Sequence, residues 1–187
     1  MKNGLTWHAW ALICLAVLLV GAIDQKNRNA LKVEQLLKTI EKDRARSGSP
    51  DRRSEVTERE LNDYIGWRLS RERRSAVTHL KVHLLDSDQV QGKIVLDARQ
   101  LNLGLFFGEA LDFDFKGLLH SRRGAARLDL DTLKLHGKPV SPQTLDMVLA
   151  AVALCYGTQP TRIDDWYGLP KGMERIVVQK GKALLYY

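Results

Sequence analysis

Hydrophobic and polar positions follow three successive patterns along the chain, and the first is an apolar run from Leu5 to Ile23. Of its 19 residues, only Thr6 and His8 are polar. This length suits a helix that crosses a bilayer, which needs about 20 residues. The small residues around Gly21 also fit a signal-peptidase site. We therefore predict that residues 1–23 are either a transmembrane anchor or a cleaved signal segment.

The second pattern, in residues 26–44, has the period of a helix. Apolar residues recur at helical spacing from Ala30 to Ile40 among lysines, glutamates and glutamines. The stretch Arg46–Ser54 then contains Gly and Pro but no large apolar residue, which is typical of a linker. We predict an amphipathic helical spacer and polar linker over 24–53, followed by a folded domain in residues 54–187.

The third pattern has a period of two, because apolar and polar residues alternate from residue 78 to residue 137. Such alternation predicts an antiparallel sheet with one face toward the core and the other toward water. Turn residues at 86–88, 107–109 and 121–124 leave connections too short for parallel crossovers, so the strands should form a meander. The alternating apolar positions are Leu80, Val82, Leu84, Ile94, Leu96, Ala98, Leu101, Leu103, Leu105, Leu111, Phe113, Phe115, Leu128, Leu130, Leu133 and Leu135.

Two helices flank this sheet in the sequence. Thr57 and Glu60 form a capping-box pattern, which marks the start of the first helix. The Ser-Pro pair at 141–142 marks the start of the second. This second helix, 142–156, carries Asp146 as its one charge. A helix that is apolar on almost every side is either buried or in contact with lipid.

These elements predict an α+β fold, in which residues 176–187 add two short strands about a turn at Lys180 and Gly181. The expected architecture is a curved antiparallel β-meander wrapped around the one long apolar helix, 142–156, and preceded by an N-terminal membrane-targeting helix. The interior of such a sheet is either a dry core or an elongated apolar slot for an acyl chain. Alternation identifies the buried face and not what covers it, so both alternatives stay open.

The positive charge of the chain lies mostly outside the predicted domain. The formal net charge is +7, and residues 24–53 alone carry +4 of it. A basic stretch beside an apolar run suits anionic lipid headgroups. A nucleic-acid-binding protein would carry this charge on its folded domain together with a recognisable motif. We therefore expect a membrane surface, and no nucleic acid, among the partners.

No residue pattern in the sequence indicates catalysis. Ser141 precedes a proline and has no Gly-x-Ser-x-Gly elbow around it. His79 and His83 fall on the polar face of the same predicted strand, so we interpret them as surface residues and not as metal ligands. We expect a protein that is not an enzyme and that needs neither a metal nor a cofactor.

The closing segment carries a family resemblance. Leu169 to Gly181 read Leu-Pro-x-Gly-x-x-x-Ile-x-Val-x-x-Gly, after a capping-box helix, a long meander and a Val-Ser-Pro helix start at 140–142. In this order the chain resembles bacterial envelope proteins of the LmeA-like and YceB-like groups, within the tubular lipid-binding (TULIP-type) superfamily. The resemblance covers roughly residues 55–187 and implies a half-tubular sheet that binds phospholipid or another lipid in its apolar interior.

The alternating face and the helix 142–156 supply the candidate site. We expect an acyl chain to lie between them, and the arginines Arg68, Arg71 and Arg74, at or beyond the end of the first helix, to hold an anionic headgroup. The candidate lipid-binding residues are Leu80, Val82, Leu84, Ile94, Leu96, Leu103, Phe113, Phe115, Leu128, Leu130, Leu145, Val148, Leu149 and Val152.

The functional hypothesis combines these expectations. It is a single-pass protein of the bacterial inner membrane, attached through its N-terminal helix, whose periplasmic domain binds a phospholipid or other acyl-chain lipid. If the N-terminal segment is cleaved, the domain is instead secreted to the periplasm. The alternative from another class is a structural or assembly protein with a dry core that binds another envelope protein.

Overall fold

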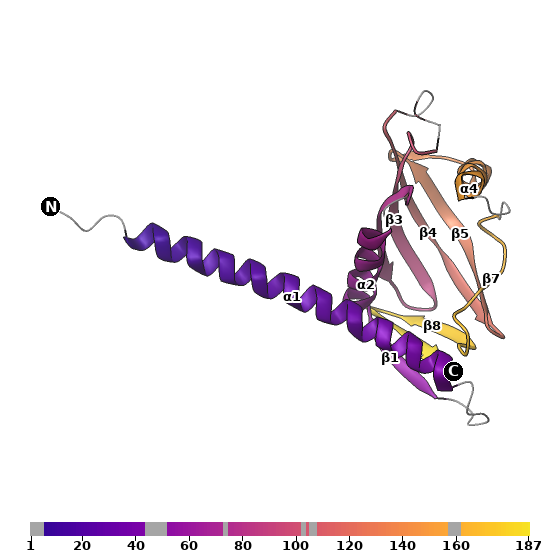
Figure 1. The fold of residues 1–187 in the computed structure, drawn as a ribbon. Coiled ribbons are helices and arrows are strands. Elements are labelled where there is room, and N and C mark those ends of the chain that lie inside the picture. The colour runs from indigo at the N-terminus through magenta and orange to yellow at the C-terminus, as the bar shows by residue number, and fades with distance from the viewer. Residues whose placement is uncertain (1–5, 44–51, 73–74, 102–103, 105–107, 157–161) are drawn as a thin grey trace.

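The computed structural model describes residues 6–43, 52–72, 75–101, 104, 108–156 and 162–187 (Figure 1). Within these ranges only the backbone is described for residues 6–23, 43, 155 and 156. The predicted anchor or signal segment therefore lies outside the described residues at 1–5, and outside the described side chains at 6–23. Where side chains are described, no helix combines the length and the apolar character needed to cross a bilayer.

The first helix, α1 (Thr6–Asp43), projects from the domain at its N-terminal end and packs onto the domain at its C-terminal end (Figure 1). The helical period predicted for residues 26–44 is confirmed as far as Asp43, but this part of α1 is more than a spacer. Val33 and Ile40 lie seven residues apart on one face of the helix, and both are buried in the core. The core therefore begins well before residue 54.

Three short strands form a small antiparallel sheet next to α1. Its order is β1 (Arg53–Thr57), β9 (Lys182–Tyr186) and β8 (Arg175–Gln179). The predicted pair of C-terminal strands is confirmed as β8 and β9. Strand β1 was not predicted, because Val56 is its one apolar residue and no alternation is visible.

The larger sheet is the predicted antiparallel meander, curled as a half-barrel (Figure 1). Strands β2 to β6 follow one another in chain order, and β7 pairs with the first residues of β5, Ala125 and Ala126. The α+β class and the curled antiparallel sheet are thus confirmed. The strands are β2 (Val77–Leu84), β3 (Gln89–Asp97), β4 (Ala110–Arg122), β5 (Ala125–Leu135), β6 (Lys138–Pro139) and β7 (Tyr167–Gly168).

One stretch of the predicted alternation is not a strand. After β3, Leu101 lies in a turn and Gly104 in a helical turn, while Leu103 and Leu105 lie outside the described residues. The physical reason is at Asp97, whose carboxylate accepts a hydrogen bond of 2.9 Å from the backbone N–H of Arg99. This side-chain turn ends the ladder before the alternating leucines begin.

The two predicted helices begin where the sequence places them. Helix α2 (Glu58–Arg71) has the complete capping box of Thr57 and Glu60. Helix α4 (Pro142–Tyr156) starts at its proline and lies over one side of the large sheet (Figure 1). Part of α4 faces outward, because Leu154 is 76% exposed and Met147 is 50% exposed. The predicted wrapping of the sheet around this helix stays a prediction.

Most of the buried side chains that the structure describes fall into two clusters. The first joins α1, α2 and the small sheet to the ends of β2 and β3, and the second joins α4 to β3, β4 and β5. Phe115 on β4 packs against both clusters. The curled sheet is therefore covered by α1 and α2 over one part and by α4 over another.

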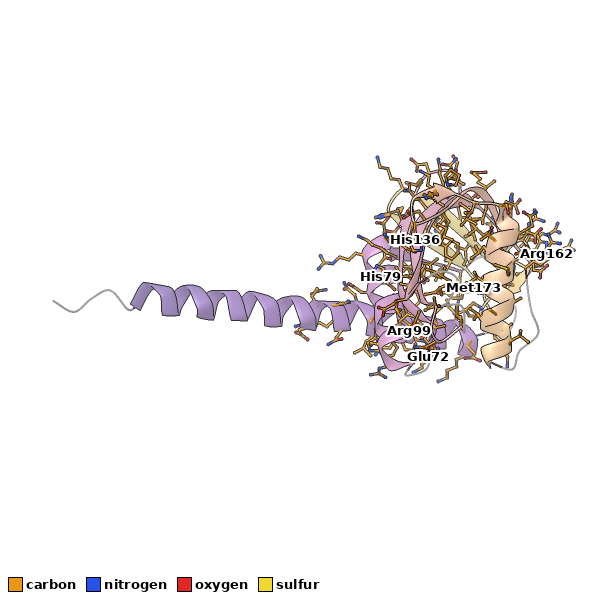
Figure 2. The ribbon with its side chains drawn as sticks, turned by 90° about the horizontal axis from the view of Figure 1, so that it is seen from above. Glu72, His79, Arg99, His136, Arg162 and Met173 are labelled. Atoms are coloured by element: carbon orange, nitrogen blue, oxygen red, sulfur yellow. The ribbon has the colours of Figure 1, made fainter. Side chains whose placement is uncertain are left out.

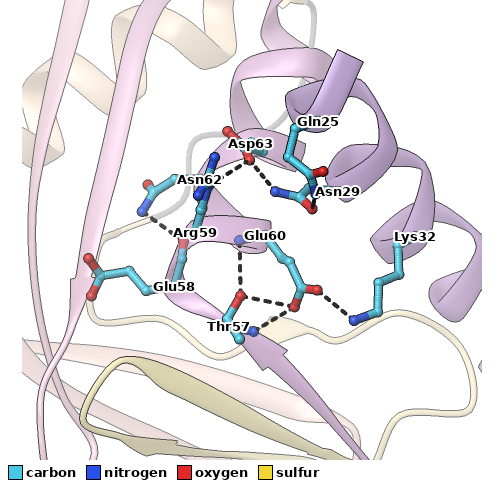
Figure 3. Close-up of polar contacts among 9 residues, drawn as sticks. All are labelled: Gln25, Asn29, Lys32, Thr57, Glu58, Arg59, Glu60, Asn62 and Asp63. Atoms are coloured by element: carbon cyan, nitrogen blue, oxygen red, sulfur yellow. Dashed lines mark hydrogen bonds and ion pairs between the residues drawn. The ribbon is translucent and has the colours of Figure 1, made fainter. Parts of the chain in front are cut away.

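Polar contacts fix α1 against α2 (Figure 3). The side-chain amide of Asn29 donates a hydrogen bond of 2.7 Å to Asp63, and Lys32 Nζ lies 2.5 Å from Glu60 Oε1. Glu60 also accepts the backbone N–H of Thr57 at 2.9 Å. Glu60 thus caps the start of α2 and also links α2 to α1.

These contacts make the contribution of Glu60 depend on pH. Burial acts to raise the pKa of the Glu60 carboxyl, but the hydrogen bonds from Lys32 and Thr57 outweigh it and leave this pKa below its usual value. Its stabilisation is complete above about pH 4.3, the pKa of an unfolded glutamate, and is lost as pH falls through the lower folded pKa. We expect Glu60→Gln to lower the free energy of unfolding by about 1 kcal/mol or less at neutral pH, after allowance for solvent screening.

Urea unfolding at neutral and acid pH checks this expectation. The difference between wild type and Glu60→Gln should disappear in acid, where the glutamate is protonated in both folded and unfolded chains. Glu41→Gln, at an exposed position of α1, is the matched control and should change little at either pH. A difference that persists unchanged in acid would show that the carboxylate charge is not its source.

Candidate functional site

An apolar cavity of about 370 Å³ lies between α1 and α2 on one side and the two sheets on the other. Its volume falls in the range of ligand pockets, roughly 300–1,000 Å³. Among the described residues, Tyr64 is the one lining side chain with a polar atom. The lining residues are Val33, Leu37, Val56, Leu61, Tyr64, Ile65, Leu80, Val82, Leu84, Val90, Phe115, Leu119, Leu128, Pro170, Met173, Ile176, Val178, Ala183 and Leu185.

Helix α2 is held over this cavity by contacts with the outer edge of β2. The side chain of Asn62 accepts the backbone N–H of Val82 and donates to its carbonyl, both at 2.8 Å. Glu58 accepts the backbone N–H of Leu84 at 2.8 Å. These bonds satisfy an edge strand and turn the apolar face of α2, with Leu61, toward the sheet.

A glycine on β3 makes room for the aromatic wall of the cavity. Gly92 pairs with Phe115 on β4, and a Cβ at this position would lie 2.5 Å from Phe115 Cζ. It would also lie 2.7 Å from the carbonyl oxygen of Lys81 on β2. The Phe115 ring therefore lies across β3 where any larger residue would displace it, and it borders the cavity.

The structure divides the predicted lipid-binding residues between two places. Five of them line the cavity, on β2, β4 and β5: Leu80, Val82, Leu84, Phe115 and Leu128. Leu103 lies outside the described residues. The other eight pack in the cluster around α4: Ile94, Leu96, Phe113, Leu130, Leu145, Val148, Leu149 and Val152.

The position of the cavity differs from the predicted slot between the sheet and the helix 142–156. No described side chain of α4 lines the cavity. Described side chains of α4, such as Val148, pack instead in the second cluster with Leu111 and Phe113. The apolar cavity therefore lies against a different part of the sheet from α4.

Sequence reasoning missed the cavity residues that come from outside the meander. Val33 and Leu37 on α1 had the correct helical spacing, but a spacing shows a face and not its partner. The same holds for Tyr64 on α2. Met173 and Ile176 belong to the segment that carries the family resemblance, which gave no indication of what they face.

Tyr64 keeps the cavity free of charge at neutral pH. Burial raises the pKa of the Tyr64 hydroxyl, and the nearby carboxylate of Glu34 raises it further, despite an opposing effect of Arg68. The phenol therefore stays protonated well beyond neutral pH. The described lining is suited to a neutral hydrocarbon and offers no group for acid–base chemistry.

The predicted headgroup arginines lie away from the cavity. Arg68 and Arg71 are exposed near the end of α2, and Arg71 stacks on Trp67 with 4.0 Å between its guanidinium carbon and the ring centre. Arg74 lies outside the described residues. A polar hollow beside the cavity is lined by Glu72 and His79 among others (Figure 2). Neither Arg68 nor Arg71 lines this hollow or the cavity.

The described residues give no indication of a metal site. They contain no group of three His, Cys, Asp or Glu side chains placed to hold an ion. His83 contacts Glu58 at 2.9 Å, and His79 is exposed. Comparisons with family models, with curated proteins and with solved structures found no match.

Proposed function

We propose that this chain is a membrane-tethered envelope protein that binds the acyl chain of a phospholipid or other lipid in the cavity between α1–α2 and the sheets. The observation that carries the proposal is the cavity itself, with its volume of about 370 Å³ and its apolar lining. Apolar cavities can bind apolar molecules. Each methylene buried there contributes about 0.8 kcal/mol.

The packing of the lining side chains supports the same proposal. The side chains that line the cavity lack contacts on the side that faces it, and a hydrocarbon guest would supply those contacts.

The rival function is a structural protein that binds another envelope protein. One observation favours it, namely the exposed apolar residues Met147 and Leu154 on α4. This surface lies outside the cavity, so the two functions predict different sensitivities to mutation. Filling the cavity should affect lipid binding only, and altering the outer face of α4 should affect a protein contact only.

Native mass spectrometry of the full chain, released from non-ionic detergent after purification from bacteria, tests the proposal. We expect a discrete adduct of lipid mass on the wild type. Leu119→Trp should reduce this adduct at least about tenfold, because the larger side chain projects into the space that the guest occupies. Leu154→Trp, the same substitution at the exposed face of α4, should leave it unchanged. An adduct that survives Leu119→Trp unchanged would place the lipid elsewhere.

A further inference from the structure

A second hollow adjoins the apolar cavity where β4 ends and β5 begins. It has a volume of about 690 Å³ and lies between the β4–β5 turn and the segment Leu169–Arg175. Pro170 and Met173 line both this hollow and the apolar cavity. The two spaces therefore meet at a wall made by these two side chains.

Four cations and one carboxylate border this hollow. The cations are Arg122, Arg123, Lys171 and Arg175, and the carboxylate is that of Glu174. Among the described residues, none of these four cations forms an ion pair. The hollow therefore carries an excess of positive charge that the described part of the chain does not neutralise.

Aromatic rings orient two of these cations without cancelling their charge. The guanidinium of Arg122 lies 4.7 Å from the ring centre of Trp166, and that of Arg175 lies 4.0 Å from the ring centre of Tyr186. Such stacking fixes the direction of a guanidinium and leaves its N–H groups free to donate. A planar donor fork of this kind suits phosphate.

Backbone hydrogen bonds hold the walls of the hollow in place. The N–H of Gly124, in the β4–β5 turn, donates to the carbonyl of Glu174 at 2.8 Å, and the N–H of Leu169 donates to the carbonyl of Gly124 at 2.8 Å. The hydroxyl of Ser121 bonds to both backbone groups of Ile176. The cations thus project from a turn and a segment that are tied to each other.

Met173 separates the charged hollow from the apolar cavity. Its side chain is 4% exposed and lies inside the domain (Figure 2). Methionine is unbranched and adapts its shape easily, so its displacement would join the two spaces. The polar hollow that shares Leu80 with the cavity is different, because there Lys26 and Lys81 are balanced by Asp63 and Glu72.

We infer that the hollow between the β4–β5 turn and Leu169–Arg175 binds the anionic, phosphate-bearing headgroup of the lipid whose acyl chain occupies the cavity. This inference rests on the proposed function and names its ligand class. Hydrocarbon and phosphate would lie on either side of the wall at Pro170 and Met173. The headgroup site is thereby separate from the arginines of α2.

Three probes on the full chain in non-ionic detergent test the inference by native mass spectrometry. Dodecanoyl lysophosphatidic acid carries both chain and phosphate, monododecanoylglycerol lacks the phosphate, and glycerol phosphate lacks the chain. We expect the first to bind at least about tenfold more tightly than the other two, as hydrogen bonds to charged groups imply. The double variant Arg123→Gln/Lys171→Gln should lose this preference and keep its affinity for monododecanoylglycerol.

Each alternative result has a distinct meaning. Equal binding of the two chain-bearing probes overturns the headgroup site and leaves the cavity function standing. Failure of both to bind overturns the proposed function and the inference with it. Glycerol phosphate binding as tightly as the lysophosphatidic acid would make the hollow a site for soluble phosphate esters, which also overturns the inference.

Matched variants keep the test independent of folding. Arg68→Gln/Arg71→Gln removes the same charge from the end of α2 and should leave the preference intact; loss of the preference there instead would place the headgroup at α2 and overturn the inference. Arg123→Lys/Lys171→Arg keeps the charge of the hollow and should keep the preference. The thermal midpoints of the four chains should agree, because these side chains are exposed.

Discussion

Replacing Phe113 with alanine is expected to lower the free energy of unfolding by about 3–5 kcal/mol, the range for a large aromatic side chain removed from a core. Phe113 is fully buried, and it packs in the cluster that joins α4 to β3, β4 and β5. Its removal would leave a space that the neighbouring strands cannot close. Chemical denaturation of the wild type and the variant measures the change.

Phe115→Ala is the informative comparison, because the two rings lie on the same face of β4, two residues apart. Phe115 is half-buried and borders the apolar cavity. We expect its removal to widen the cavity and to shift binding toward longer acyl chains, measured with a series of monoacylglycerols. Phe113→Ala should leave that preference unchanged wherever the variant is folded. A shift produced by Phe113→Ala and not by Phe115→Ala would place the acyl chain beneath α4.

This pair of residues also shows what alternation in a sequence can and cannot establish. Residues two apart on a strand share a face but lie about 7 Å from each other. In a curled sheet that distance is enough to move from the part covered by α4 to the part covered by α1 and α2. The face of Phe113 and Phe115 was predictable, whereas the covering element was not, because it depends on contacts between distant parts of the chain.

Local signals gave the parts of the fold that depend on a few neighbouring residues. The capping box of Thr57 and Glu60 acts across three residues and placed the start of α2. The turns at 86–88 and 121–124 contain residues in the left-handed region, Asp88 and Gly124 among them, and fix the meander. By contrast, β1 exists because β9 pairs with it 125 or more residues later in the chain, at Arg53 and Tyr186 for example. Nothing in its own five residues indicates that pairing.

The candidate site was predictable in kind and not in position. Five cavity residues came from the alternating strands, as at Val82 and Leu128. The cations of the second hollow were visible in the sequence as a turn, Arg122 and Arg123 included, but their relation to the loop at Lys171 required the tertiary structure. Charged residues that are distant in the sequence form a binding site only where the fold brings them together.

Replacing Ile40 with alanine is expected to lower the free energy of unfolding by about 2–5 kcal/mol, as for other buried isoleucines. Ile40 is 1% exposed and packs among residues of α1 and the small sheet. Leu31→Ala is the matched control on the same helix, since Leu31 is 46% exposed, and it should change stability by about 0.5 kcal/mol or less. Equal, small effects of both substitutions would show that α1 is the detached spacer that its sequence suggested.

The consequence of a large Ile40 effect reaches beyond stability. Val33 and Leu37, on the same part of α1, line the apolar cavity, and the helix continues toward the N-terminal apolar run. A loosened α1 would therefore open the cavity on the side that Val33 and Leu37 cover. Under the proposed function, we expect Ile40→Ala to weaken binding of monododecanoylglycerol while Leu31→Ala does not, because only the former disturbs the helix that covers the acyl chain. Binding unaffected by Ile40→Ala in a chain shown to be destabilised would mean that α2 and the sheets enclose the lipid without help from α1.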